Sequence, residues 1–356
     1  MATHYSIKND SNIVGETGSL LVAANNAITA EKNQANVTGG GVCDNTNDEV
    51  QLAAADAACN YGIVTLSSGS FEIDAALALD NGGHLVGKGC GDLGWGTRLN
   101  ISGTDYGITL TPSGNYMGGV HNLTIHTPAS FATAALTVDN NGTDIRGRHI
   151  LSRLALKAYH AGVGEGTPDI TSGGIGINFL CTSGFNQNVF ETIYITGFQK
   201  CMQVYINETA DTWYYMNGNF FNWWTLAFGQ YLMYFDINAA TGYNQGDFAF
   251  NMFTGLILEP STVHDLTDYG IYAVGTGYGR FWGSYITQFI CWDCDYIDTN
   301  VIYLDNNCPN NYIEGAWKSP YFTYADPWWH TENEPTVVDN GSNNVLTTRY
   351  LNGDIL

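Results

Sequence analysis

The chain alternates apolar and polar residues in short stretches that recur at a nearly constant spacing. The stretches NVFETIYITGF, from residue 188, and NFFNWWTLAFG, from residue 219, each open with Asn and place apolar residues two, five and seven positions later. Alternation of this kind is typical of a β-strand with one buried face. The pattern opens at six places that lie 31, 32, 29, 31 and 33 residues apart: Asn188, Asn219, Asn251, Arg280, Asn311 and Asn344.

Two earlier stretches extend the pattern, GGVHNLTIH with Gly118 at the opening place and HILSRLALK with His149 there. A strand that recurs every 31 residues or so, with Gly- and Asn-rich stretches between, predicts an all-β fold, a parallel β-solenoid. Equal positions of successive coils then stack, and stacked Asn side chains can hydrogen-bond along the column. The apolar residues expected in the core two places after each opening are Val120, Leu151, Phe190, Phe221, Phe253, Trp282, Ile313 and Leu346.

The stretch TNDEVQLAAADAACNYG predicts a short helix that caps the N-terminal end of the solenoid. Thr46 and Glu49 have the spacing of a capping box, and Gly62 follows the end of the helical pattern. An open end of a parallel sheet exposes unpaired backbone, so a cap is expected. We therefore divide the chain into an N-terminal arm or docking segment (1–42), a capping helix (43–62) and a parallel β-helix (63–356).

The segment from residue 44 to residue 91 resembles the opening of pectate-lyase-like right-handed β-helix proteins. The resemblance rests on the stretch TNDEVQLAAADAACNYGIVTLSSGSFEIDAALALDNGGHLVGKG. In that superfamily a helix precedes a strand pair of the form G-x-V-x-L-x-x-G-x-F-x-I and then an L-x-G-x-G strand. The family includes polysaccharide lyases, glycoside hydrolases and viral tailspikes. The resemblance implies a right-handed helix and a glycan ligand, but no catalytic motif of the family transfers residue by residue.

Composition excludes two classes of partner. With 34 acidic and 12 basic residues the formal charge is -22, which disfavours binding to nucleic acid and to anionic membranes. No apolar run near 18 residues predicts membrane insertion, and the N-terminus lacks the features of a signal peptide. The motif CWDC, Cys291 and Cys294, has no second CxxC to complete a zinc site, so buried thiols or disulfides are favoured.

Basic and titratable residues gather on the outward places of three consecutive predicted strands. Four of the twelve basic residues lie between positions 146 and 157. In a lyase, His or Arg would take the proton beside a uronate carboxylate, which Arg153 or Lys157 would neutralise. In a hydrolase, Glu191 would be one of two carboxylates. A solvated face of mixed charge is the alternative. The candidate catalytic residues are Glu191, Arg153, Lys157, His121 and His126.

Outward aromatic and amide side chains beside this cluster are candidates for stacking on sugars and hydrogen-bonding to them. The candidate substrate-binding residues are Tyr194, Trp223, Asn122 and Asn222. No metal site is predicted. Calcium is considered because several acidic residues collect near predicted turns, although ordinary solvated carboxylates are the favoured interpretation. These acidic residues are Asp265, Asp268, Asp293, Asp295, Asp298 and Asp305.

The sequence therefore favours a polysaccharide-recognising β-helix of tailspike type on a virion or cell surface, which cleaves its glycan by β-elimination or hydrolysis. The alternative is a non-catalytic attachment or structural protein, a viral spike or a surface filament component. The resemblance to tailspikes implies a homo-oligomer, such as a trimer, although the sequence contains no coiled-coil heptads. Residues 1–42 fall outside the repeat and are the candidate arm for docking in a virion or surface assembly.

Overall fold

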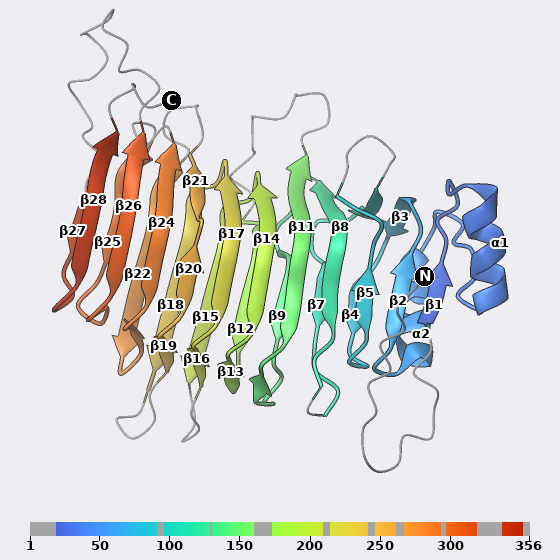
Figure 1. The fold of residues 1–356 in the computed structure, drawn as a ribbon, viewed down its shortest axis with the longest axis horizontal. Helices are drawn as coiled ribbons and strands as arrows, with labels where there is room; N and C mark the ends of the chain where they lie inside the picture. The colour runs from blue at the N-terminus through green and yellow to red at the C-terminus, as the bar shows by residue number, and fades with distance from the viewer. Residues whose placement is uncertain are drawn as a thin grey trace, which may run out of the picture.

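Strands of successive coils lie side by side and pair in parallel along the whole computed structural model (Figure 1). The structure describes residues 19–90, 96–114, 116–128, 130–159, 173–208, 214–240, 246–260, 267–292, 297–318 and 337–351. In the middle of the solenoid each coil contributes to all three sheets, as β14, β15 and β16 do before β17 begins the next coil, whereas the described coils nearer the two ends contribute only to the two larger sheets. Crossovers between parallel strands of one sheet are right-handed in nearly all proteins. The predicted right-handed parallel β-helix is confirmed.

Among the described residues the three sheets contain fourteen, nine and five strands. The fourteen-stranded sheet consists of β1 (Ser19–Val22), β2 (Ile63–Leu66), β3 (Gly69–Ile73), β5 (His84–Val86), β6 (Thr97–Ile101), β8 (Gly119–Pro128), β11 (His149–Tyr159), β14 (Val189–Thr196), β17 (Phe220–Ala227), β20 (Met252–Thr254), β21 (Ile257–Glu259), β24 (Tyr285–Trp292), β26 (Tyr312–Lys318) and β28 (Val345–Leu351). The nine-stranded sheet consists of β4 (Leu77–Leu79), β7 (Ile108–Leu110), β9 (Ala134–Asp139), β12 (Ile175–Cys181), β15 (Lys200–Glu208), β18 (Tyr231–Ala239), β22 (Thr267–Gly277), β25 (Ile297–Leu304) and β27 (Val337–Asp339). The five-stranded sheet consists of β10 (Ile145–Arg146), β13 (Gly184–Asn186), β16 (Tyr215–Asn217), β19 (Asp247–Ala249) and β23 (Arg280–Trp282).

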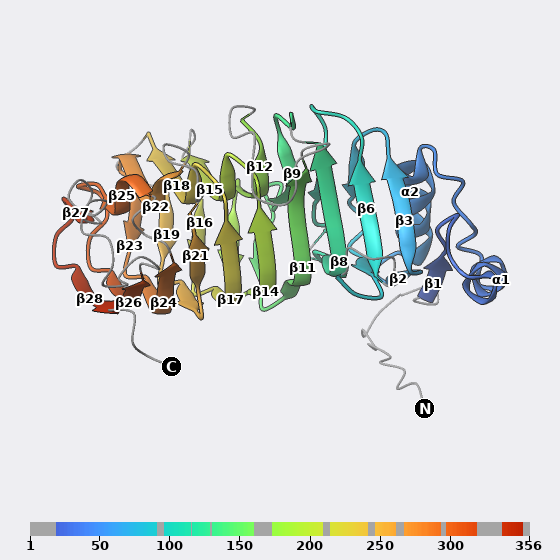
Figure 2. The same cartoon turned by 90° about the horizontal axis from the view of Figure 1, so that it is seen from above.

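The fourteen- and nine-stranded sheets enclose the core from opposite sides, as the view from above shows (Figure 2). Phe179 of the nine-stranded sheet contacts Phe190 and Phe221 of the other sheet, with ring centroids 4.9 and 5.9 Å apart. Within the core, Phe221 stacks on Phe253 of the next coil at 4.3 Å. Equal positions of successive coils therefore pack directly on one another, as a solenoid requires.

A buried column of asparagines marks the turn between the five- and fourteen-stranded sheets, as predicted. Asn188 Nδ2 donates to Asn219 Oδ1 at 3.1 Å, and Asn219 Nδ2 donates to Asn251 Oδ1 at 2.9 Å. The residue before each member has a positive φ, for example Gln187 and Phe250. We number positions within a coil from this column, so that Asn188 is position 0.

The apolar residues predicted at positions 2, 5 and 7 are buried, except that Leu346 in the last coil is half-buried and Trp282 lies in another sheet. A repeated left-handed residue explains the gap of three between positions 2 and 5. Position 4 has a φ between 52 and 70° in six consecutive coils: Asn122, Arg153, Thr192, Trp223, Gly255 and Gln288. A residue in this conformation interrupts the alternation of the strand. Positions 3 and 4 therefore both face outward, and position 5 returns to the core.

Two predicted openings of the repeat were wrong in register. Ser284, and not Arg280, occupies position 0, because β24 pairs with β20 through Tyr285 and Met252. Arg280 and Trp282 belong instead to β23 in the five-stranded sheet, and Ile286 takes the core place assigned to Trp282. In the earlier coil position 0 is Arg148, because a bulge between residues 149 and 151 adds one residue and moves His149 to position 1.

Two helices cover the N-terminal end of the stack, α1 (Thr29–Thr38) and α2 (Asp48–Cys59) (Figure 1). The predicted capping box does not form at α2, because Thr46 Oγ1 bonds to Asp44 and Glu49 Oε2 accepts the backbone N–H of Asp74. Within the segment assigned to an arm (1–42), β1 pairs in parallel with β2 and so continues the sheet. The division into three domains stays a prediction, and residues 1–18 lie outside the described residues.

Candidate functional site

Three histidines, a serine and a glutamate from four consecutive coils meet on the outer face of the fourteen-stranded sheet. We call this group the histidine cluster; its members are His84, His121, His149, Ser152 and Glu191. Each lies at position 1 or position 3 of its coil, on β5, β8, β11 or β14. Because coils are stacked about 4.8 Å apart, these positions become neighbours although the residues span more than a hundred positions of sequence.

Three members form a hydrogen-bonded chain. His84 Nδ1 lies 2.9 Å from His121 Nε2, and His121 Nδ1 lies 2.9 Å from Ser152 Oγ. Neutral imidazole has one donor and one acceptor nitrogen, so all protons in the chain point toward His84 or all point toward Ser152. The chain can therefore hold a proton at either end without breaking a hydrogen bond.

A glycine makes this contact between the two histidines possible. Gly119 pairs with His84 in the sheet and lies between His84 and His149 in the position 1 column. A Cβ at residue 119 would lie 2.3 Å from His121 Nε2 and 2.7 Å from the carbonyl oxygen of Ile150. Because Gly119 lacks a side chain, the imidazole of His121 occupies that space and stacks on His84, with ring centroids 5.1 Å apart.

Burial keeps these two imidazoles neutral. Loss of water around His121, and then the nearby charges of His84 and His149, lower its pKa to about 3. The pKa of His84 is also lowered, first by burial and then by His149 and Arg148. Both rings are therefore uncharged at neutral pH and available as hydrogen-bond acceptors.

His149 and Glu191 form the solvent-facing half of the cluster. His149 Nε2 lies 3.2 Å from Glu191 Oε1, and the two side chains are 47% and 36% exposed. The His149 ring also contacts the edge of His121, with centroids 5.7 Å apart. A carboxylate that accepts the Nε2–H of a histidine fixes the tautomer that leaves Nδ1 as the proton acceptor.

Aromatic and basic side chains border the histidine cluster toward the N-terminal end. The guanidinium carbon of Arg148 lies 5.4 Å from the ring centroid of Tyr116, within the range of a cation–π contact. Tyr116 in turn contacts Tyr61, with centroids 5.0 Å apart. Arg148 follows Gly147, whose φ is 61°, and is exposed. An exposed cation thus lies near His84 and directly precedes His149 in the chain.

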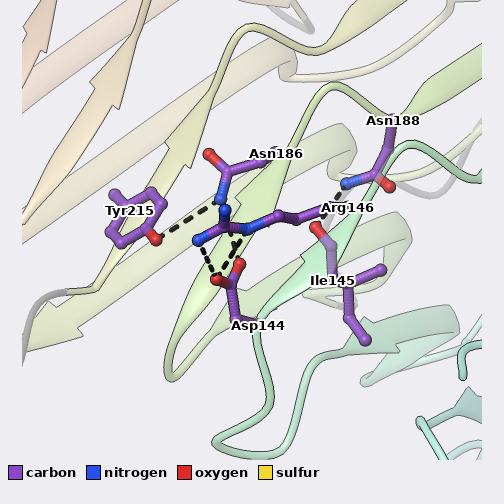
Figure 3. Close-up of polar contacts among 6 residues, drawn as sticks. All are labelled: Asp144, Ile145, Arg146, Asn186, Asn188 and Tyr215. Atoms are coloured by element: carbon purple, nitrogen blue, oxygen red, sulfur yellow. Dashed lines mark hydrogen bonds and ion pairs between the residues drawn. The ribbon is translucent and has the colours of Figure 1, made fainter. Parts of the chain in front are cut away.

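A second polar group lies across the turn, on the outer face of the five-stranded sheet (Figure 3). Arg146 Nε donates to Asp144 Oδ2 at 2.8 Å, and the pKa of the guanidinium is raised by this carboxylate. Asn186 Nδ2 bridges Asp144 Oδ1 at 3.0 Å and the Tyr215 hydroxyl at 3.3 Å. These contacts hold Arg146, whose side chain is 66% exposed, on the corner next to Arg148.

The structure separates four of the five candidate catalytic residues into two pairs, with Arg153 between them. His121 and Glu191 lie in the histidine cluster, at position 3 of their coils. His126 and Lys157 pair with each other at position 8, about 15 Å farther along the strand. Lys157 Nζ lies there 5.7 Å from the ring centroid of Tyr194. Arg153 is exposed at the left-handed position 4 between the two groups.

The candidate substrate-binding residues also fall into groups with different surroundings. Asn122 Nδ2 donates to the carbonyl oxygen of Gly87 at 2.9 Å, which gives it a structural role in the turn. Asn222 follows Glu191 in the position 3 column, and Trp223 beside it is 64% exposed. Exposed apolar side chains continue from there along the next coils; we call them the apolar stripe: Phe220, Trp223, Met252 and Tyr285.

The described part of the chain contains no group of three His, Cys, Asp or Glu side chains placed to hold a metal. Of the acidic residues considered for calcium, Asp268 accepts Gln230 Nε2 at 2.7 Å and Asp305 accepts the Gly275 N–H at 2.7 Å. Asp265, Asp293 and Asp295, and the side chain of Asp298, lie outside the described residues. Seven cysteines, including buried Cys291, are free thiols, and Cys294 is not described.

Comparisons with known proteins do not assign this chain to a family. No family model and no curated protein matches it. A search of solved structures returns the catalytic domain of a GH87 α-1,3-glucanase in complex with nigerose, at 11% identity and a TM-score of 0.29, over 98% of this chain and 70% of that one. At this level the fold rests on the strand pairing and not on the match. No helix among the described residues is long and apolar enough to cross a membrane.

Proposed function

We propose that the chain binds a polysaccharide along the outer face of the fourteen-stranded sheet and cleaves it by β-elimination at the histidine cluster. The contact between His149 and Glu191, with the exposed guanidinium of Arg148 adjacent in sequence, is the observation that supports this most directly. Together these side chains supply a base, an orienting carboxylate and a cation. A uronate-containing glycan is the substrate class that needs all three.

The proposed reaction balances with these groups alone. Arg148 neutralises the uronate carboxylate, which makes the neighbouring C–H more acidic. His149 Nδ1 accepts that proton, the electron pair forms a C=C bond, and the C–O bond to the leaving sugar breaks. The imidazolium, stabilised by Glu191, then returns the proton to the leaving oxygen. One glycosidic bond is broken and one unsaturated uronate is formed, without water as a reactant.

The spacing of carboxylates favours elimination over hydrolysis. Glycosidases place two carboxyl groups within about 10 Å of each other. Among the described residues at positions 1 and 3, the next carboxylate after Glu191 toward the C-terminal end is Glu314, four coils away. At about 4.8 Å per coil this separation is about 19 Å, too far to act on the same bond. Hydrolysis is therefore the second outcome of the test below.

The apolar stripe supports a binding track that leads away from the cluster. Phe220, Met252 and Tyr285 occupy position 1 of the three coils that follow Val189, and they are 40, 39 and 48% exposed. Apolar faces of sugar rings stack on such side chains, and Asn222 at position 3 can bond to their hydroxyls. A glycan lying parallel to the solenoid axis would contact both the stripe and the cluster.

The tailspike-type setting also belongs to the proposal: a virion or cell-surface protein, oligomeric or docked through its N-terminal segment. It is supported by the resemblance of residues 44–91 to the pectate-lyase-like superfamily. The non-catalytic alternative, an attachment or structural protein with the same rod-like fold, predicts glycan binding or none, and no cleavage.

The proposal is tested with the full chain on polyuronates and neutral glycans, by ultraviolet absorbance of the unsaturated product and by an assay of reducing ends. We expect both signals with at least one polyuronate, and a loss of about 100-fold or more in His149→Ala and Glu191→Gln. Glu314→Gln is the matched control and should keep full activity. New reducing ends without the absorbance would indicate hydrolysis, and no signal from any glycan would favour the non-catalytic protein.

A further inference from the structure

Five tyrosines occupy two adjacent columns on the outer face of the nine-stranded sheet. Tyr231 pairs with Tyr269, and Tyr234 pairs with Tyr272, which pairs with Tyr303. We call these five residues the tyrosine ladder. All are half-buried, on strands β18, β22 and β25. The sequence shows 22 tyrosines with no obvious grouping, and only the register of this sheet brings these five together.

Rings within each column stack on one another. Tyr234 and Tyr272 have centroids 5.3 Å apart and an interplanar angle of 16°, and Tyr272 and Tyr303 have values of 5.0 Å and 15°. Tyr231 and Tyr269 are stacked at 5.4 Å and 12°. The ring faces inside the columns are therefore covered by neighbouring rings. What the ladder presents to a ligand is a row of ring edges and phenol hydroxyls at the spacing of the coils.

The hydroxyls of Tyr231, Tyr234 and Tyr272 are neutral and available, whereas that of Tyr269 is hydrogen-bonded to Thr299. Burial, followed by nearby carboxylates and tyrosines, raises the pKa of Tyr234 to about 12 and also raises that of Tyr231 and Tyr272. Within the described part of the chain, the hydroxyls of these three residues have no hydrogen-bond partner. Each can both donate and accept, as the hydroxyls of a sugar can.

The surroundings of the ladder exclude the other obvious ligands. Asp236, Asp268 and Asp305 lie close enough to act on the phenols, so a polyanion would be repelled. A cationic partner would need an open ring face, but the faces between coils are covered. At the N-terminal end of the second column, Lys200 Nζ already lies 3.9 Å from the Tyr234 ring centroid.

We propose that the tyrosine ladder is a second glycan-binding surface, which takes a neutral linear polysaccharide lying parallel to the solenoid axis. The hydroxyls of the ladder repeat at the spacing of the coils, so a linear polymer whose units each carry hydroxyls can hydrogen-bond to several of them at once. The ladder lies on the opposite side of the core from the histidine cluster, so this surface does not depend on the proposed cleavage (Figure 2).

The test is affinity electrophoresis of the full chain in gels that contain a soluble linear β-glucan, xylan, mannan or dextran, with polygalacturonate as the acidic comparison. We expect at least one neutral glycan to retard the wild type. The triple variant Tyr234→Phe, Tyr272→Phe, Tyr303→Phe keeps the stacked rings and removes three hydroxyls, and it should bind that glycan about tenfold more weakly with an unchanged melting temperature.

Tyr278→Phe, which removes the hydroxyl of a tyrosine that is 53% exposed and lies outside both the tyrosine ladder and the apolar stripe, is the matched control and should bind like the wild type. Protection of Tyr272 from tyrosine nitration by the same glycan, read by mass spectrometry, gives an independent check. The proposal is wrong if no neutral glycan retards the wild type, if the triple variant binds equally well, or if Tyr278→Phe loses binding to the same extent. Cleavage of a polyuronate is measured separately and is expected to be unchanged in the triple variant.

Discussion

The two large faces of this solenoid share a backbone repeat but use it in opposite ways. On the nine-stranded sheet one column reads Tyr234, Tyr272, Tyr303, and like side chains stack on like. On the fourteen-stranded sheet four consecutive residues of the position 3 column are His121, Ser152, Glu191 and Asn222, and no two neighbours among these four are alike. Repeated side chains stabilise neighbouring coils, whereas a column of different side chains brings several chemical groups to one place. The candidate chemistry lies where the outward repeat is broken.

Buried side chains of the interior contribute more to holding the coils together than the side chains of either outer face. Asn219 tests this, because its side chain bonds Asn188, Asn251 and the carbonyl oxygen of Phe185 while fully buried. Asn219→Ala should lower the free energy of unfolding by about 3 kcal/mol, since several buried partners lose their bonds. Asn344→Ala, at the end of the column, should cost about 1 kcal/mol. Equal values in chemical denaturation would contradict a cooperative column.

Truncation of one aromatic residue on each face distinguishes a side chain that stacks between coils from a side chain that is exposed to solvent. Tyr272 contacts tyrosines of both adjacent coils, so Tyr272→Ala should cost about 2 kcal/mol. Trp223 is 64% exposed, and Trp223→Ala should change stability by less than about 0.5 kcal/mol. Denaturant midpoints of the two variants measure the difference. A larger loss in Trp223→Ala would reverse the roles assigned to the two faces.

The pH dependence of stability should distinguish the buried histidines from the rest of the chain. His121 has a folded-state pKa of about 3, far below the value of about 6.5 in the unfolded chain. Below pH 6.5 the unfolded state binds a proton that the folded state excludes, so stability falls as the pH is lowered. His121→Gln should remove up to about 1.4 kcal/mol per pH unit of this slope between pH 6 and 4. Parallel curves for variant and wild type would contradict a neutral His121.

The left-handed column at position 4 gives the smallest expected effect. Thr192 is β-branched and has a φ of 54°, a conformation that glycine adopts without strain. Thr192→Gly should therefore raise the unfolding free energy by about 1 kcal/mol. Gly255→Ala is the opposite change, because the new Cβ would lie 2.6 Å from the Trp223 ring. A rise in melting temperature for the first and a fall for the second is the expected pair of results.

The fold could be predicted from sequence because the same physical requirement recurs in every coil. Buried positions 2, 5 and 7 must be apolar, and position 0 must bond along the column, so both repeat visibly. The predicted register was wrong only where the Asn pattern is interrupted. Ser284 occupies position 0 where Asn was expected, and a bulge shifts His149 by one position. Local substitutions and single-residue bulges leave no trace in an apolar repeat.

The candidate site was less predictable, because it depends on distances along a strand and on the absence of a side chain at Gly119. Five residues of strand, from position 3 to position 8, separate His126 and Lys157 from His121 and Glu191. His84 joins His121 only because Gly119 leaves room for the ring. Neither feature follows from the types of residues, although His84 could have been found once β5 was aligned with β8.

The proposed chemistry of the face with the broken repeat depends on His149 and Glu191. Its most direct test follows the absorbance of unsaturated product when the wild type and Glu191→Gln are incubated with polyuronates under the same conditions. We expect product from the wild type, about 100-fold less from Glu191→Gln, and the same denaturant midpoint for both. Equal rates in the two proteins would show that any cleavage occurs elsewhere on the molecule.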